Sequence, residues 1–184
     1  MLEAQPFIEQ LSLQPCICAP FGLYRHKHIS LVISGIGKTN AAMASAWLIL
    51  TEAPKLIVNA GAAGATDTRS ELGSIYQISE VIEPDRMIFE AYDNIPDQIR
   101  GFPSAVLATQ DKPLKLPEDR KMLSADAQMT DMEGASVVQV CKSSKFPVIC
   151  SNLSAIPRQT IASEKTSRAI GKDFANLSCL LYGT

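Results

Sequence analysis

The sequence predicts an α/β fold with three layers, in which a mixed sheet is flanked by helices. A strand-like, a helical and a second strand-like segment follow one another between residues 29 and 59. Strand-like and helical segments keep alternating farther along the chain, which is typical of sheets covered by helices. The length of 184 residues and the hydrophobic content of 46% suit one globular domain over residues 1–184.

The unit between residues 29 and 59 is the clearest element of the pattern. Residues 29–34 are mostly apolar and predict a strand, and the alanine- and leucine-rich stretch 40–50 predicts a helix that Pro54 ends. Residues 55–59 predict the next strand. Because a helix connects them, the two strands are expected to be parallel.

The other elements lie on both sides of this unit. Upstream, short antiparallel strands are expected around a turn at His26 and Lys27. Downstream, alternating apolar runs predict further strands and two helices. The expected strands are 16–20, 23–25, a strand from 28 onward, 74–82, 104–109, 128–132 and 146–150; the expected helices are 134–142 and 163–181; and 111–117 is expected to be a loop.

Composition argues against several classes of partner. The formal net charge is −2 and no cluster of Lys and Arg occurs, so nucleic acid is not an expected ligand. The most apolar stretch, 41–50, is too short to cross a membrane. The N-terminus does not resemble a secretory signal, and five scattered cysteines fit reduced thiols in the cytoplasm. The only histidines, His26 and His28, have no cysteine at ligand spacing, so no metal is expected.

Two glycine-rich segments follow predicted strands, at residues 35–37 and 61–64. The first one does not form a phosphate-binding loop, because Val32 occupies the position of that loop's first glycine. It does not form a dinucleotide fingerprint either, because Asn40 occupies the position of the third glycine. No organic cofactor is therefore expected. Such turns bring the backbone close to a ligand or only let a helix pack tightly on a strand, and each one alone favours the second interpretation.

Three segments in order resemble the nucleoside phosphorylase and nucleosidase superfamily, and especially its methylthioadenosine/S-adenosylhomocysteine nucleosidases. They are SGIGKTNAA at 34–42, NAGAAG at 59–64 with LGSI at 72–75, and DMEGA at 131–135. Each motif is weak alone, but the ordered set runs through most of the chain. The resemblance implies a phosphorylase-like fold and cleavage of the bond between the sugar and the base of a nucleoside.

The resemblance also implies roles for individual residues. Glu133 accepts hydrogen bonds from the ribose hydroxyls, Met132 packs beneath the sugar, and Asp131 adds a second acceptor. A carboxylate suits this role because hydrogen bonds to a charged acceptor are stronger than neutral ones. The alternative for Glu133 is a carboxylate that stabilises a helix N-terminus. Ala62, Ala63 and Gly64 are expected to form the floor of the pocket, or only a structural turn.

The expected catalytic residues are Glu3 and Asn152. Glu3 lies in a segment similar to the one whose glutamate activates water in the family, although only two residues precede it, so the usual first strand is expected to be missing. A solvated chain end is the alternative for Glu3. Asn152 stands where the nucleosidases carry an aspartate that protonates the base, and Ser151 beside it is expected to bind substrate. An amide hydrogen-bonds a base but gives up no proton at neutral pH.

Three functions remain open from the sequence. The first is hydrolysis of a purine nucleoside of the methylthioadenosine/S-adenosylhomocysteine type to free base and sugar. The second is a catalytically impaired homologue that binds a nucleoside or a base, which Asn152 and the missing strand motivate. The third is a purine nucleoside phosphorylase, although the glycine segment 59–64 lacks the arginine that the family's phosphorylases carry there. A homodimer is expected by analogy.

Overall fold

The computed structural model describes residues 4–16, 20–66, 70, 73–84, 86, 88–90 and 102–155. Glu3 and the helix expected at 163–181 lie outside these residues, so both stay predictions, and so does the missing first strand. The elements are α1 (Gln5–Gln10), β1 (Gln14–Cys16), β2 (Gly22–His26), β3 (Ile29–Ile33), α2 (Lys38–Glu52), β4 (Ile57–Ala65), β5 (Ile75–Ile82), β6 (Ile88–Glu90), β7 (Ser104–Thr109), α3 (Pro117–Leu123), β8 (Met129–Asp131), α4 (Gly134–Ser143) and β9 (Val148–Ala155). None of the helices within the described ranges combines the length and the apolar character that a membrane span requires.

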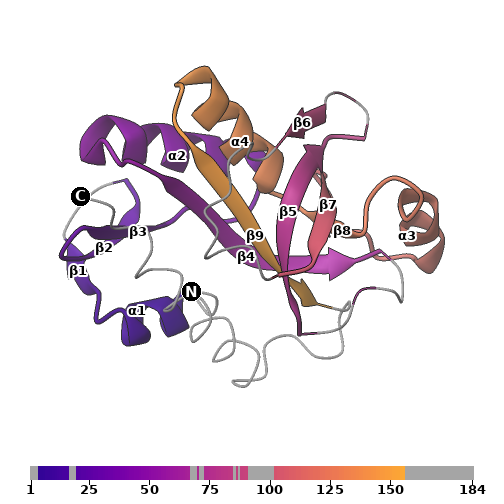
Figure 1. Cartoon of the computed structure of the whole chain (residues 1–184), viewed down its shortest axis with the longest axis horizontal. Coiled ribbons are helices and arrows are strands. Elements are labelled where there is room, and N and C mark those ends of the chain that lie inside the picture. Colours follow the sequence, from indigo (N-terminus) through magenta and orange to yellow (C-terminus); the bar gives the residue numbers. More distant parts are fainter. Residues whose placement is uncertain are drawn as a thin grey trace.

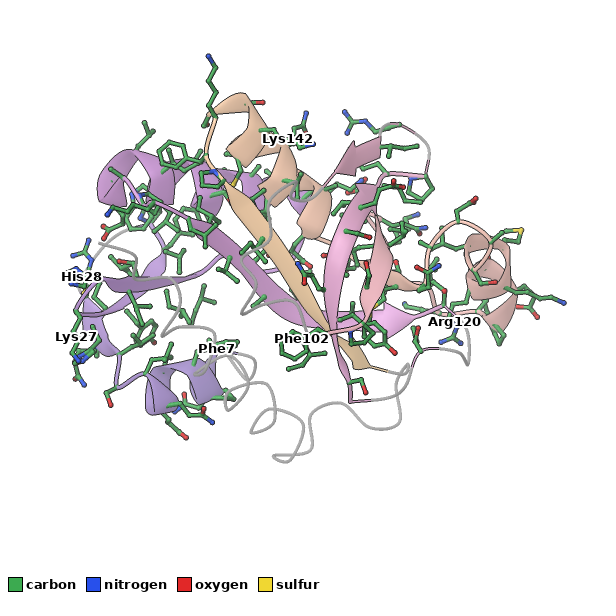
Figure 2. The ribbon with its side chains drawn as sticks, in the orientation of Figure 1. Phe7, Lys27, His28, Phe102, Arg120 and Lys142 are labelled. Carbon is green, nitrogen blue, oxygen red and sulfur yellow. The ribbon has the colours of Figure 1, made fainter. Side chains whose placement is uncertain are left out.

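Strands β1, β2 and β3 form a small antiparallel sheet, as the sequence predicts. The tight turn between β2 and β3 places Lys27 at a φ of 52°. Lys27 and His28 lie at the outer margin of the molecule, far from α3 in the view of Figure 2. This sheet is a hairpin with one additional strand.

The larger sheet contains six strands in the order β6-β5-β7-β8-β4-β9. β9 pairs in parallel with β4 and antiparallel with β5, so five of the strands close into a ring. The expectation that β3 and β4 form a parallel pair is wrong, because β3 belongs to the small sheet. The position beside β4 is occupied by β9, which pairs with it along eight residues from Ile57 to Gly64.

Helices cover the larger sheet on two faces, which confirms the mixed three-layer α/β fold. Alternate residues of β7 separate the faces, because Leu107 belongs to a core with α2 and α4, whereas Ala108 belongs to a second core with α3. Figure 1 shows α2 and α4 side by side along β4 and β9, with α3 at the opposite end of the molecule. The largest fully buried side chains include Ile78, Leu107, Met129 and Val138, which fill the space under α4.

The bounds of several elements differ from the expected ones. β4 continues to Ala65, through the glycine segment that was expected to be a turn. β9 begins at Val148 and continues to Ala155, whereas its expected end was residue 150. Helix α3 begins at Pro117, where a loop was expected to end. Proline suits the first turn of a helix because the N–H that it lacks has no intrahelical partner there.

Candidate active site

Three contacts connect segments that contain or adjoin the expected site residues. The backbone N–H of Gly37 donates to Oε1 of Glu133 at 2.7 Å, which joins the start of α2 to the residue before α4. Gly64 of β4 pairs with Thr130 of β8. Gly61 of β4 pairs with Asn152 of β9. The fold thus links segments that lie far apart in the sequence.

Glu133 lies at the meeting point of two helix N-termini. It is the N-cap residue of α4, and its carboxylate accepts a hydrogen bond from the residue before α2. Its second oxygen accepts the N–H of Met132 at 3.2 Å. The partial positive charge of a helix N-terminus stabilises a carboxylate. Glu133 and Met132 are both half-buried, so part of the carboxylate surface stays accessible.

Asp131 is the buried partner of this segment. Its Oδ1 accepts the Thr109 hydroxyl at 2.6 Å, and its Oδ2 accepts the N–H of Gly134 at 2.7 Å. The pKa of Asp131 is raised to about 6, mainly by burial and to a smaller extent by the nearby charge of Glu133, although the hydrogen bonds from Thr109 and Gly134 act in the opposite direction. Both oxygens are engaged within the protein, so the carboxylate mainly fixes the start of α4.

Gly134 allows this arrangement because a side chain would not fit there. A Cβ atom at this position would lie 2.7 Å from Cδ2 of Leu107 and 3.0 Å from Oδ2 of Asp131. The hydroxyl oxygen of Thr109 also accepts the N–H of Ala135 at 2.9 Å. Helix α4 therefore begins in close contact with the carboxyl ends of β7 and β8.

The predicted pocket floor lies within strand β4. Ala62 is exposed, Gly64 is half-buried, and Ala63 is part of the hydrophobic core. Ala62 and Gly64 are therefore the members of this set that retain exposed surface.

Asn152 and Ser151 lie inside β9, three and four residues before its end at Ala155. Both residues were expected to follow a strand that ends at residue 150, but β9 remains paired with β4 as far as Ala155. On its other side Asn152 pairs with Tyr76 of β5. β4 lies between β9 and β8, so β4 separates the strand of Asn152 from the strand that precedes Glu133.

An ion-pair network that was not predicted from the sequence lies at the start of α2, next to Gly37. Nζ of Lys38 lies 2.8 Å from Oε1 of Glu83 and 3.5 Å from Oδ2 of Asp111. Arg86 contacts the same oxygen of Glu83 at 3.4 Å. Local sequence patterns do not reveal this network, because its members come from three segments that are far apart in the sequence. The sequence offered one signal: Glu83 directly follows one predicted strand and Asp111 lies two residues after another, and strands of this kind end at one sheet edge.

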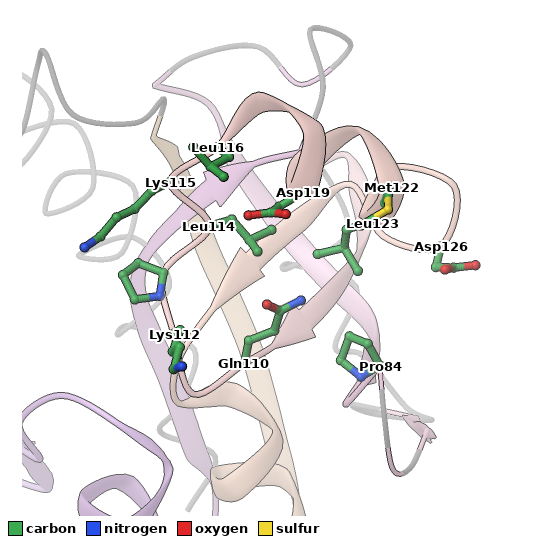
Figure 3. Close-up of a pocket in the computed structure, with 11 residues that line it drawn as sticks. Pro84, Gln110, Lys112, Leu114, Lys115, Leu116, Asp119, Met122, Leu123 and Asp126 are labelled. Carbon is green, nitrogen blue, oxygen red and sulfur yellow. The ribbon is translucent and has the colours of Figure 1, made fainter.

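A pocket of about 780 Å³ lies between α3 and the loop that precedes it. Figure 3 shows Gln110, Leu114, Asp119 and Leu123 facing this space, and no residue expected to bind substrate is among those that line it. Gln110 connects this pocket to the segment of Asp131 and Glu133, because the backbone N–H of Gln110 donates to the carbonyl oxygen of Asp131 at 3.0 Å. Among the described residues, no three His, Cys, Asp or Glu side chains gather as metal ligands.

Comparisons with known proteins identify the family of the chain. The model of the phosphorylase superfamily matches residues 5–114. The chain is similar to the 5′-methylthioadenosine/S-adenosylhomocysteine nucleosidase of Arabidopsis thaliana, with 30% identity over 181 residues that cover 80% of this chain and 71% of that protein. It is also similar to the nucleosidase of the same name from Oceanobacillus iheyensis, with 27% identity over 92% of this chain and 87% of that protein.

A solved structure has the same fold. The native futalosine hydrolase of Helicobacter pylori superposes with a TM-score of 0.86 and 16% identity, and the match covers 97% of this chain and 94% of that one. The family model spans more than half of the sequence, and the two nucleosidases align with most of it. The resemblance inferred from the motifs is therefore confirmed, and the protein belongs to the phosphorylase superfamily.

Proposed function

We propose that the protein is a nucleosidase that hydrolyses the bond between sugar and base in a purine nucleoside of the methylthioadenosine/S-adenosylhomocysteine type. The observation that carries this proposal is the 2.7 Å hydrogen bond from Gly37 to Glu133. It holds a partly exposed carboxylate between two helix N-termini, beside the carboxyl ends of β7 and β8. In α/β sheets, ligands bind at the carboxyl ends of strands.

In this proposal Glu133 binds the ribose through hydrogen bonds. Gly37 and Met132 donate to its two oxygens, and the remaining lone pairs accept the ribose hydroxyls. Met132 packs beneath the sugar, and Ala62 and Gly64 form the floor, while the buried Ala63 fixes this segment in the core. Asp131 supports this segment from below through Thr109 and Gly134.

The proposed reaction adds one water molecule across the glycosidic bond. The water oxygen bonds to the sugar carbon as the bond from that carbon to the base nitrogen breaks. Glu3 takes a proton from the water, and the departing base takes up a proton. Asn152 and Ser151 hydrogen-bond the base or substrate, with water or another donor as the source of the base's proton.

We favour water over phosphate as the nucleophile. Phosphorolysis requires cationic side chains free to bind a phosphate. Two of the described arginines are already paired, Arg25 with Glu52 and Arg86 with Glu83. The glycine segment of β4 contains no arginine.

A second candidate is a homologue that binds a nucleoside without cleaving it. Asn152 favours this candidate, because an amide cannot replace a general acid, and loss of such an acid costs roughly 10²–10⁴ in rate. The alternative explanation for Asn152 is a preference for another base. Substrate specificity distinguishes a lost general acid from a changed base preference, because only the second leaves efficient release of some other base.

The test is the release of free base from a panel of nucleosides, followed by chromatography with and without phosphate. The panel contains methylthioadenosine, S-adenosylhomocysteine, adenosine, inosine, guanosine and futalosine. Release without phosphate is the expected result. Release that depends on phosphate would identify a phosphorylase, and binding without release by folded protein would identify a nucleoside-binding protein.

We further propose that the protein acts as a homodimer in the cytoplasm. Ile36, Met43 and Leu50 recur every seven residues along and just before α2, and they are 75%, 55% and 84% exposed. Met43 and Leu50 lie on one face of α2, Ile36 precedes the helix, and an exposed apolar face favours association. Cys16 and Cys141, which are free thiols, agree with a reducing compartment.

A further inference from the structure

Helix α2 is held at both ends by ion pairs. At its N-terminal end, Nζ of Lys38 lies 2.8 Å from Oε1 of Glu83, whose side chain is only 2% exposed. At its C-terminal end, Glu52 pairs with Arg25 of β2, and Nε of Arg25 donates to Oε2 of Glu52 at 3.0 Å. The two pairs anchor the same helix, but only the first is next to the candidate active site.

The N-terminal pair adjoins a turn whose peptide is also held locally, because Nδ2 of Asn40 donates to the carbonyl oxygen of Ile36 at 2.8 Å. Gly37 has a φ of 99°, and a Cβ atom there would meet nothing within 4 Å. A glycine in open space retains wide conformational freedom. Its N–H nevertheless donates to Glu133, and the next residue in the chain is Lys38. The ion pair of Lys38 is thus a longer-range contact directly beside this turn, in addition to the local hydrogen bond from Asn40.

Glu83 and Asp111 provide anchors from two different strands. Glu83 directly follows β5, and Asp111 comes two residues after β7, and these strands are parallel neighbours. Lys38 thus ties the start of α2 to the carboxyl edge of the sheet, where β7 and β8 also end. Burial lowers the pKa of Lys38, but the hydrogen bond and the charge of Glu83 outweigh this and raise it, so Lys38 stays cationic at neutral pH.

We propose that Lys38, through its ion pair with Glu83, is a positioning residue that fixes the Gly37 N–H against the Glu133 carboxylate. This inference rests on the proposed function only for its effect on substrate. Its structural part, the dependence of the Gly37–Glu133 hydrogen bond on Lys38, needs no substrate. The two parts can therefore fail separately.

Four variants test the proposal. Lys38→Met removes the cation and keeps much of the side-chain length. The double variant Lys38→Met/Glu83→Gln removes both charges, so no unpaired carboxylate is left buried if the single variant fails to fold. Lys38→Arg keeps the charge. The matched control is Arg25→Met/Glu52→Gln, which removes the ion pair at the other end of α2.

The first readout is hydrogen exchange of the Gly37 amide, and the second is the Michaelis constant for the preferred nucleoside. Loss of the ion pair is expected to speed exchange at Gly37 about tenfold, because the amide is protected only while its hydrogen bond is closed. The KM is expected to rise about tenfold with little change in kcat, the pattern expected when binding is lost equally in the ground and transition states. Lys38→Arg is expected to restore both, and the control pair is expected to change only the melting temperature.

Two results would overturn the proposal. One is wild-type exchange at Gly37 in both variants that carry Lys38→Met. The other is an equal change of exchange and KM in the Arg25/Glu52 control, which would mean that any weakening of α2 has this effect. If the wild-type protein releases no base, faster exchange at Gly37 still supports the positioning role while the proposed function fails.

Discussion

Thr109 donates its hydroxyl hydrogen to Oδ1 of Asp131 over 2.6 Å, where the parallel strands β7 and β8 end side by side. The same hydroxyl oxygen accepts the N–H of Ala135. Thr109 and Asp131 are both buried, so this small network determines where helix α4 begins. Glu133 lies between Asp131 and Ala135 in the sequence, so the same network also fixes the position of Glu133.

Replacement of Asp131 by Asn is expected to change how stability depends on pH. The pKa of Asp131 is about 6 in the folded protein, compared with 3.8 for an aspartate in the unfolded chain. Because the folded pKa is the higher one, its contribution to stability is complete below about pH 4 and is lost as pH rises through about 6, by roughly 3 kcal/mol. An amide still accepts from Gly134 and donates to Thr109, but it does not titrate.

The measurement is the free energy of unfolding from urea titrations between pH 4 and 7. The difference between wild type and Asp131→Asn should shift in favour of the variant across this range. Asp126→Asn, at an exposed position, is the control and should show a flat difference. A flat difference for Asp131→Asn as well would contradict the raised pKa.

Gly134→Ala is expected to destabilise the protein by about 1–3 kcal/mol, the usual cost of overpacking a close contact. Alanine normally stabilises a helix relative to glycine, so the sign tests whether the 2.7 Å approach to Leu107 dominates. Thermal and urea unfolding measure the effect. Gln139→Ala at an exposed position of α4 is the control, and a stabilised Gly134→Ala variant would refute the close packing.

Glu133→Gln is expected to weaken nucleoside binding about 10- to 100-fold while the fold stays intact, because the hydrogen bonds to the sugar lose their charged acceptor. Titration calorimetry with a nucleoside measures the affinity, and circular dichroism checks the fold. Glu118→Gln on the exposed side of α3 serves as the matched control. Unchanged affinity in Glu133→Gln would remove the ribose role.

Asn152→Asp is expected to raise turnover of adenine nucleosides about 100-fold if a missing general acid limits the rate. Base release from methylthioadenosine and from inosine gives the comparison, and Asn152→Ala shows what the amide itself contributes. If the rate does not increase, the amide has another role, such as recognition of a different base.

Local patterns were sufficient to predict the main helices and strands. Alanine-rich sequence and Pro54 predicted α2, which ends at Glu52 with Ala53 in a left-handed conformation. The strand expected at 104–109 has the same bounds as β7. These elements depend on near neighbours in the chain, and composition and spacing describe such neighbours well.

Pairing between distant segments could not be predicted in this way. The glycines of 61–64 indicated a turn, yet they lie in a strand because β9 pairs with all of them. The double pairing of β9 left no local signal, and neither did the contact between Lys38 and Glu83. Helix α3 was not predicted, although a local signal exists: Pro117 is followed by Glu118 and Asp119 and then by Arg120 and Lys121, a charge order that suits a helix.

The double pairing of β9 also has a consequence for the folding chain during synthesis. Until β9 is synthesised, the edge of β4 that faces β9 and the corresponding edge of the first half of β5 have no partner within this sheet. Unpaired edges are templates for aggregation with other chains. A fragment that ends before Val148 should therefore aggregate. Pairing of β9 with β4 and β5 covers the exposed edges and protects the earlier strands from intermolecular pairing.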